Sequence, residues 1–99
     1  MFEKDLSLSL LYDIYAPLLS EKKREVFEGY YLSDLSLAEI AQETGTSRQA
    51  VRELIRRTSD ELCELEKALG LLAKRKRLRE LCDSISADRE ILDEIRELL

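Results

Sequence analysis

The sequence contains no histidine and no tryptophan, and its 99 residues include only one proline and three glycines. Without histidine, a zinc site of the mixed Cys/His kind and a catalytic Cys–His pair are both excluded. Cys63 and Cys82 are the only cysteines, and they do not form a CxxC pair. We therefore expect buried or partly buried free thiols in a reducing compartment, and no metal or other cofactor.

The short motifs of common enzymes are also missing. The chain has no P-loop, no GxGxxG and no GxSxG pattern. Paired carboxylates such as Asp93 and Glu94 occur only within segments of helical periodicity, where a solvated helix face is the simpler interpretation. We therefore do not expect an enzyme.

No apolar run approaches the length of a membrane span, and acidic Glu3 and Asp5 stand where a signal peptide would be positively charged. We expect a cytoplasmic protein without membrane insertion.

Hydrophobic residues at 44% and charged residues at 37%, with little glycine or proline, are typical of an all-α protein. We expect a helix-turn-helix domain with an elongated last helix over residues 1–73. A C-terminal helical extension over 74–99 is expected to belong to the same compact unit.

Residues 36–57, SLAEIAQETGTSRQAVRELIRR, have the spacing of a helix-turn-helix. Ser36 and Glu39 form a capping box at the start of the first helix. Gly45 occupies the turn, where a positive φ is costly for other residues. Ser47 caps the second helix. Inward positions carry apolar side chains: Leu37, Ile40, Ala41, Val51 and Leu54.

One position departs from the usual pattern of this motif. Thr46 follows the turn glycine, where a branched aliphatic residue is more common. Its methyl group is expected to pack in the same way.

Positive charge is confined to two short segments of a chain whose net charge is −5. One of them lies on the second helix of the motif, the recognition helix, and its candidate nucleic-acid-binding residues are Ser47, Arg48, Gln49, Arg52, Arg56 and Arg57. Arg48 or Arg52 has the geometry to pair with guanine, and Gln49 with adenine. Arg56 and Arg57 are expected to reach phosphates. Three-helix packing without a DNA role is the alternative.

Caps and periodicity divide the N-terminal part into two further helices. Asp5 caps a helix that runs to about Ala16, with Pro17 near its exit. Ser20 caps a second helix over residues 21–31. The two adjacent tyrosines near its end have two interpretations, a stacking platform for bases or core packing, and their helical spacing favours the core.

A heptad pattern continues beyond the motif through Val51, Ile55, Thr58, Leu62, Leu65, Leu69 and Leu72. It predicts that the recognition helix extends to about Leu72, with fraying or a kink at Gly70. Two interpretations of this row are open. It packs against helices of its own chain or against a second copy.

The second basic segment consists of Lys74, Arg75, Lys76, Arg77 and Arg79. It is either a phosphate-contacting patch or a solvated helix face that pairs with the acidic C-terminus, and the second interpretation is preferred. Ser86 then caps a last helix over residues 87–99. Its strong apolar stripe requires a partner surface, within the chain or across a dimer.

The chain resembles the YlxM-like small bacterial proteins, whose helix-turn-helix is similar to region 4 of sigma-70-type factors. The resemblance covers about residues 8–78 and is carried by LLYDIYAPLLSEKKREVFEGYYLSDLSLAEI, SRQAVRELIRRTSDEL and LEKALGLL. It implies a cytosolic, all-helical and often dimeric protein that regulates the signal recognition particle pathway, whose GTPase gene neighbours the family's genes. The family's Ser-Arg-Gln-Ala-Val corresponds to residues 47–51 and its basic pair to Arg56 and Arg57. Arg52 stands where the family often has an aromatic residue.

Together these features predict a homodimeric, helix-turn-helix DNA-binding regulatory protein, linked through the resemblance to the signal recognition particle pathway. The alternative is a non-catalytic adaptor that binds the particle's GTPase or RNA without reading DNA sequence. A purely structural helical dimer is a third interpretation.

Overall fold

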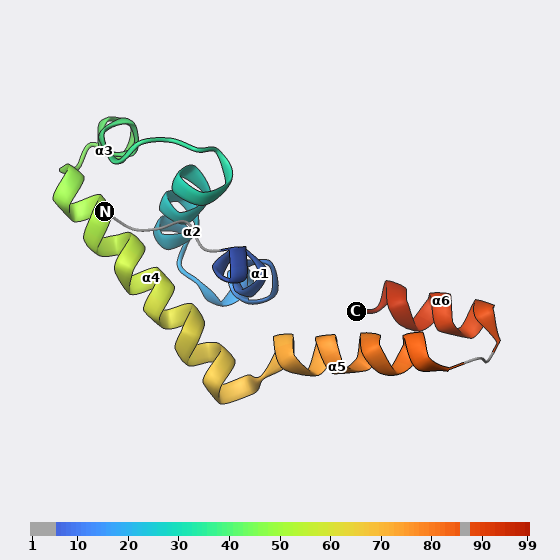
Figure 1. Ribbon diagram of the computed structural model, residues 1–99. Helices are drawn as coiled ribbons and strands as arrows, with labels where there is room; N and C mark the ends of the chain where they lie inside the picture. Colours follow the sequence, from blue (N-terminus) through green and yellow to red (C-terminus); the bar gives the residue numbers. More distant parts are fainter. Residues whose placement is uncertain (1–5, 86–87) are drawn as a thin grey trace.

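The computed structural model describes residues 6–85 and 88–99, which form six α-helices and no β-strand (Figure 1). The helices are α1 Leu6–Tyr15, α2 Glu21–Phe27, α3 Leu37–Thr44, α4 Arg48–Leu69, α5 Leu71–Ser84 and α6 Arg89–Glu97. The all-α class predicted from the sequence is confirmed. None of these helices is both long enough and apolar enough to cross a membrane.

The first two helices end slightly earlier than predicted. α1 ends at Tyr15, and Ala16–Leu18 form a 3-10 turn that contains Pro17. α2 gives way at Glu28–Leu32 to a π-helical turn, in which the Ser33 N–H donates to the Glu28 carbonyl at 2.9 Å. The backbone therefore stays helical over the predicted segment, but its last turn is wider.

Two predicted caps, Asp5 and Ser86, lie outside the described residues. α6 begins at Arg89 rather than at residue 87, and its N-cap is Asp88, whose carboxylate accepts from the Glu90 N–H at 2.9 Å. The carboxylate accepts from a backbone N–H that has no partner within the helix. Its negative charge also interacts favourably with the positive end of the helix dipole.

An aromatic cluster joins α1, α2 and α4. Phe27 is fully buried, with the Tyr12 ring stacked at 4.5 Å and the Tyr31 ring at 4.4 Å between centroids. The buried members of this core are Leu11, Tyr12, Tyr15, Leu19, Phe27, Leu62 and Leu72. This cluster fixes the N-terminal helices against the middle of α4.

A second core lies under the helix-turn-helix. Its buried members are Val26, Tyr30, Ile40, Ala41, Val51 and Ile55. Tyr30 is only 1% exposed, which leaves its ring inaccessible for stacking on bases. The core interpretation of the tyrosine pair is therefore confirmed.

The predicted heptad row of α4 packs mainly within its own chain. Val51, Ile55, Thr58 and Leu62 are all at most 2% exposed, whereas Leu69 is 43% exposed. The prediction of a long helix with an interruption at Gly70 is confirmed, although the helix ends three residues before the expected position near residue 72. Gly70, with φ of +63°, ends α4 in the left-handed conformation, and Leu72 belongs to α5.

A polar junction fixes the direction in which α5 leaves α4. The Glu66 carboxylate accepts the Leu72 N–H at 3.0 Å and the Ala73 N–H at 3.1 Å, so a side chain of α4 caps α5. Buried Tyr15 donates its hydroxyl to the same carboxylate at 2.6 Å and accepts the Leu71 N–H at 3.2 Å. α1, α4 and α5 therefore meet in one hydrogen-bond network.

The two thiols differ in burial. Cys82 is buried, as expected, but Cys63 is exposed, which contradicts the expectation for that residue. Cys63 follows buried Leu62 on α4, and a rotation of about 100° per residue carries it away from the core.

We predict that Glu66→Gln destabilises the protein by about 1–3 kcal/mol, because an amide replaces a carboxylate that accepts three hydrogen bonds. Urea denaturation followed by circular dichroism measures the change. Glu64→Gln on the exposed side of α4 is the control. Equal stability of the two variants would show that the junction does not contribute.

The same carboxylate predicts a pH dependence. Partial burial raises the pKa of Glu66, but hydrogen bonds from Tyr15, Leu72 and Ala73 outweigh burial and hold the pKa below its ordinary value. Its contribution to stability is therefore present above the ordinary glutamate range and is lost as pH falls through the lowered pKa. Between about pH 5 and pH 3 the wild type should lose more stability than Glu66→Gln. Parallel loss in both proteins would contradict this assignment.

Candidate nucleic-acid interface

α3 begins at the predicted capping box. The Ser36 hydroxyl accepts the Glu39 N–H at 3.1 Å, and the Glu39 carboxylate accepts the Ser36 N–H at 3.2 Å. Ile40 and Ala41 on its inner side are buried in the second core. Local capping and close packing together position the first helix of the motif.

The turn has the positive φ that was predicted at its glycine. Gly45 has φ of +69°, and the N–H groups of Gly45 and Thr46 both donate to the Ala41 carbonyl. Thr46 is exposed rather than packed through its methyl group, and its hydroxyl lies 3.0 Å from that of Thr44. The expectation for Thr46 is therefore wrong, because this turn leaves its side chain at the surface.

Ser47 is the N-cap of α4, and its hydroxyl accepts the Ala50 N–H at 3.0 Å. Its confirmed role is structural. It also leaves the first N–H groups of a 22-residue helix directed outward, where the positive end of the helix dipole lies.

The outer face of the motif is an open hollow. It is lined by Leu37, Ser47, Arg48, Gln49, Ala50, Arg52, Glu53 and Arg56. Arg48, Gln49 and Arg52 lie in the first turns of α4 with exposed side chains. The structure therefore brings five of the six predicted residues to one concave surface. Arg57 lies instead at a neighbouring apolar hollow between α2 and α4, beside Lys22 and Leu54.

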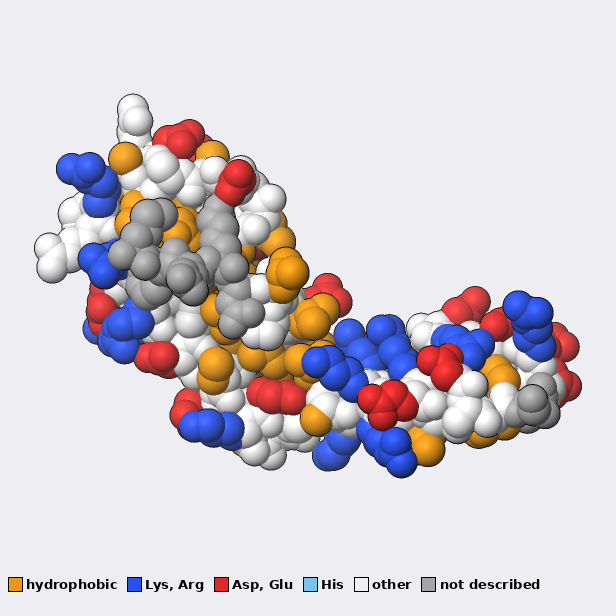
Figure 2. Space-filling view, in the orientation of Figure 1, with side chains coloured by type: hydrophobic (Ala, Val, Ile, Leu, Met, Phe, Trp, Pro, Cys, Tyr) orange, Lys and Arg blue, Asp and Glu red, His pale blue; other side chains and the backbone are white. Residues whose placement is uncertain are grey.

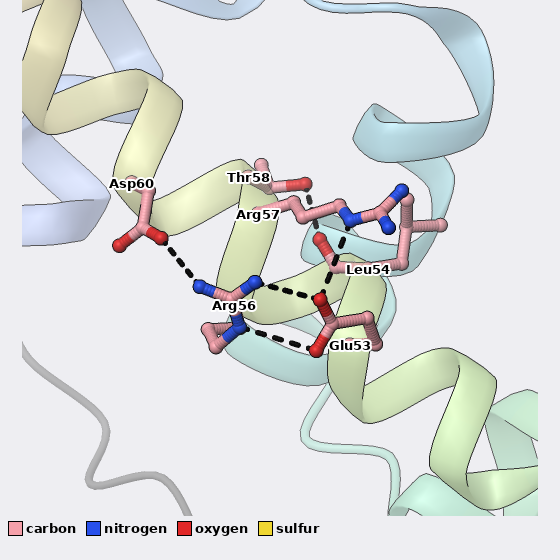
Figure 3. Close-up of polar contacts among 6 residues, drawn as sticks. All are labelled: Glu53, Leu54, Arg56, Arg57, Thr58 and Asp60. Carbon is pink, nitrogen blue, oxygen red and sulfur yellow. Dashed lines mark hydrogen bonds and ion pairs between the residues drawn. The ribbon is translucent and has the colours of Figure 1, made fainter.

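Glu53 is the residue of this surface that the sequence interpretation missed. Its carboxylate accepts two hydrogen bonds from Arg56, at 2.6 and 3.1 Å, and one from Arg57 at 3.4 Å (Figure 3). Arg56 also donates to Asp60 at 2.8 Å. The bonds from Arg56 hold the pKa of Glu53 below its ordinary value, so the carboxylate is charged at neutral pH. The positive charges of Arg56 and Arg57, which were expected to contact phosphates, are thus paired with carboxylates of the same helix.

The spacing contained a signal for this network. Glu53 lies three residues before Arg56 and four before Arg57, the separations at which side chains meet on a helix. All three side chains are substantially exposed, and exposed ion pairs contribute little to stability because water weakens them. The arginines can therefore exchange Glu53 for another anion at little cost.

The second basic segment lies on α5, at the other end of α4. Along α4, the start of α5 lies about 33 Å from Arg48 but only about 18 Å from Arg57. Figure 2 shows basic side chains over both regions of the same face. The structure does not bring the two predicted patches together.

Most cations of the α5 segment contact groups of their own chain. Arg75 lies 4.0 Å from Asp13, and Arg77 lies 3.3 Å from Glu80. Lys74 donates to the Leu69 carbonyl and Arg79 to the Leu99 carbonyl, each at 3.2 Å. The α5 segment is therefore less available to a ligand than its charge alone suggests.

Comparisons with known proteins agree with this geometry. Residues 2–99 match the family described as "Putative helix-turn-helix protein, YlxM / p13 like", UPF0122. A UPF0122 protein of Symbiobacterium thermophilum is 47% identical over 94 aligned positions, which cover 93% of this chain and 88% of the relative. A UPF0122 protein of Clostridium kluyveri is 42% identical over 106 positions, which cover 98% and 96%. One of Geobacillus kaustophilus is 42% identical, with 99% and 96% covered.

The family match extends over almost the whole chain, including α5 and α6, where the sequence resemblance ended near residue 78. The capped α3, the left-handed glycine turn and the exposed start of α4 are the structural counterparts of the family's description. This chain belongs to the YlxM / p13-like family of helix-turn-helix proteins.

Proposed function

We propose that this protein is a DNA-binding regulatory protein that places the start of α4 in the major groove. The observation that carries the proposal is the open hollow at the outer face of the helix-turn-helix. Arg48, Gln49 and Arg52 lie there with exposed side chains, while the opposite side of the helix is held in the core. A recognition helix requires this combination of rigid support and exposed polar side chains.

The side chains of the first two turns supply the chemistry for reading bases. A guanidinium of Arg48 or Arg52 can donate two hydrogen bonds to guanine O6 and N7. The Gln49 amide can donate to adenine N7 and accept from its N6 amino group. The N–H groups at the start of α4 favour a nearby phosphate.

Phosphate binding by Arg56 and Arg57 requires an exchange of partners. Both guanidinium groups bond Glu53, and a DNA phosphate would take its place as the acceptor. Glu53 then remains close to the DNA as an uncompensated negative charge. It therefore lowers affinity for any sequence and makes binding depend more on correct base contacts.

A homodimer is part of this proposal, because the positive region of one copy is small. The chain carries a net charge of −5, against a net +3 over residues 47–57. Two copies would double the phosphate contacts and read two half-sites. In this proposal the protein acts in the cytoplasm and is not an enzyme.

A second candidate function is an adaptor that binds the RNA or the GTPase of the signal recognition particle. The observation that favours it is the separate basic segment on α5, about 33 Å along α4 from Arg48. Lys76 there is exposed, and the contacts of Arg77 are exchangeable surface contacts. Neutralising residues 74–79 tests this candidate separately.

We predict that Arg48→Ala with Gln49→Ala weakens binding to the protein's DNA site by about 1–3 kcal/mol per lost base contact. A gel-shift titration at several salt concentrations, with a site first selected from random duplexes, measures the loss. Lys67→Ala, at the far end of α4, is the matched control and should leave affinity unchanged. DNA binding that survives the double substitution but fails when residues 74–79 are neutralised would exclude reading by α4.

We also predict that Glu53→Gln raises affinity for random duplex DNA by about two- to tenfold, because it removes a negative charge and releases two arginines. The salt dependence of binding should become steeper, and selectivity for the preferred site should fall. Glu64→Gln, which changes net charge equally outside the hollow, serves for comparison. An equal gain in both variants would show that only net charge matters.

A further inference from the structure

The apolar hollow between α2 and α4 lies beside the reading surface, on the flank of the recognition helix. Its volume is about 290 Å³, close to the lower end of the range of about 300–1,000 Å³ that is typical of small-molecule sites. That is room for about ten groups the size of a water molecule. We call it the flank hollow, and it is lined by Lys22, Val26, Thr46, Ala50, Val51, Glu53, Leu54 and Arg57.

The inner part of the flank hollow is apolar. Val26 and Val51 are 1% and 2% exposed and belong to the core beneath the helix-turn-helix, and half-buried Leu54 packs against the same core. Ala50, also in the lining, presents only a methyl group. An apolar chain placed here would contact a rigid surface, because the valines are fixed by packing within the core.

Two cations lie at the rim of this apolar surface. Lys22 is in the first turn of α2 and Arg57 is in the middle of α4, and both side chains are exposed. Over residues 6–85 and 88–99, Lys22 forms no ion pair, and Arg57 pairs only with Glu53, through Nε at 3.4 Å. Figure 3 shows the Arg57 guanidinium extending beside the Leu54 side chain, which lines the same hollow. Both cations are therefore available to an anionic group.

Glu53 restricts the charge of that anionic group. Its carboxylate belongs to the lining of the flank hollow and also to that of the reading surface. It repels a doubly charged phosphate more strongly than a singly charged carboxylate. A guanidinium also matches a carboxylate in shape, because it can donate two parallel hydrogen bonds to the two oxygens. The rim therefore favours a monocarboxylate.

Thr46 adds a polar group to the same hollow. It is the position at which the helix-turn-helix departs from its usual branched aliphatic residue, and its exposed hydroxyl lies 3.0 Å from that of Thr44. A hydroxyl can donate to a carboxylate oxygen, which an aliphatic side chain cannot do. The departure from the motif thus has a chemical use at this site.

We infer that the flank hollow binds a small carboxylic acid with an apolar chain. The carboxylate lies between Lys22 and Arg57, and the chain lies against Val26 and Val51. The number of water-sized groups that the hollow admits is close to the size of octanoate.

Such a ligand would act on the reading surface through Arg57. This guanidinium bonds Glu53 in the free protein, and in the proposed DNA complex it bonds a phosphate. A ligand carboxylate on Arg57 removes that phosphate contact, so the ligand and DNA each weaken binding of the other by the same factor. The regulation rests on the proposed DNA reading, whereas the binding site does not.

Octanoate is the probe for the site, in a titration followed by two-dimensional NMR of the ¹⁵N-labelled protein. Amide shifts should centre on α2 and the first half of α4. Octanoate should bind at least about fivefold more tightly than 1-octanol, which lacks the charge, and than octyl phosphate, which carries a second one. Equal binding of 1-octanol, or shifts centred on α5 and α6, would overturn the site.

Variants of the lining separate the charge from the apolar surface. Lys22→Gln with Arg57→Gln should weaken octanoate binding at least about tenfold and leave 1-octanol binding unchanged. Lys67→Gln with Arg89→Gln removes the same charge elsewhere and should have no effect. Ala50→Leu suits a helix and fills the hollow, so it should abolish binding of both compounds. Octanoate binding that survives these changes in variants shown to be folded by circular dichroism excludes the flank hollow.

The effect on DNA is a separate measurement. Saturating octanoate should reduce the slope of log K against log salt for random duplex DNA by about 1, the loss of one phosphate contact, whereas equimolar acetate should not. Arg57→Gln should show the reduced slope without octanoate and should not respond to it.

The two measurements have distinct failures. Octanoate that binds the hollow without changing the slope overturns the regulation. A protein that binds no DNA overturns the proposed function, and the NMR titration still decides the site. Absence of octanoate binding overturns this inference and leaves DNA reading by Arg48 and Gln49 untouched.

Discussion

The buried row on one side of α4 is the constraint on which the rest of this structure depends. Ile55, Thr58 and Leu62 are fully buried. Ile55 belongs to the core beneath the helix-turn-helix, and Leu62 belongs to the aromatic core formed with α1 and α2. α4 thus packs in both cores, and its contacts in each core independently fix its rotation about its own axis. That rotation decides which side chains of its first turns face outward, so the recognition surface is set by packing some distance from it.

The electrostatics of the surface follow from the same helix. Glu53 and the arginines after it lie on the outer side of α4, where water weakens each ion pair. The network therefore adds little stability, but it reduces the attraction of the surface for any polyanion. An acidic chain with a partly neutralised reading helix favours selective contact over tight non-specific contact.

Features governed by neighbouring residues could be predicted from the sequence. The Ser36 capping box, the left-handed Gly45 and the Ser47 cap each depend on a few adjacent positions. The heptad pattern predicted the long α4 and an interruption at Gly70. It did not predict the direction in which α5 leaves, because tertiary contacts set that direction. The Glu66 cap depends on Tyr15, 51 residues away, which no local pattern reveals. At the site, five of the six predicted residues share one hollow, whereas Arg57 lies at a neighbouring one. The spacing of Glu53 from Arg56 and Arg57 indicated that they could pair, but only the structure shows the bonds.

The junction at Gly70 also sets the direction in which α5 and α6 extend away from the other helices (Figure 1). α5 has 14 residues and is about 21 Å long, so a rotation of about 10° at its first turn moves its far end by about 4 Å. A small adjustment of the three hydrogen bonds around the Glu66 carboxylate therefore shifts the far end of α5 by about 4 Å relative to the helix-turn-helix.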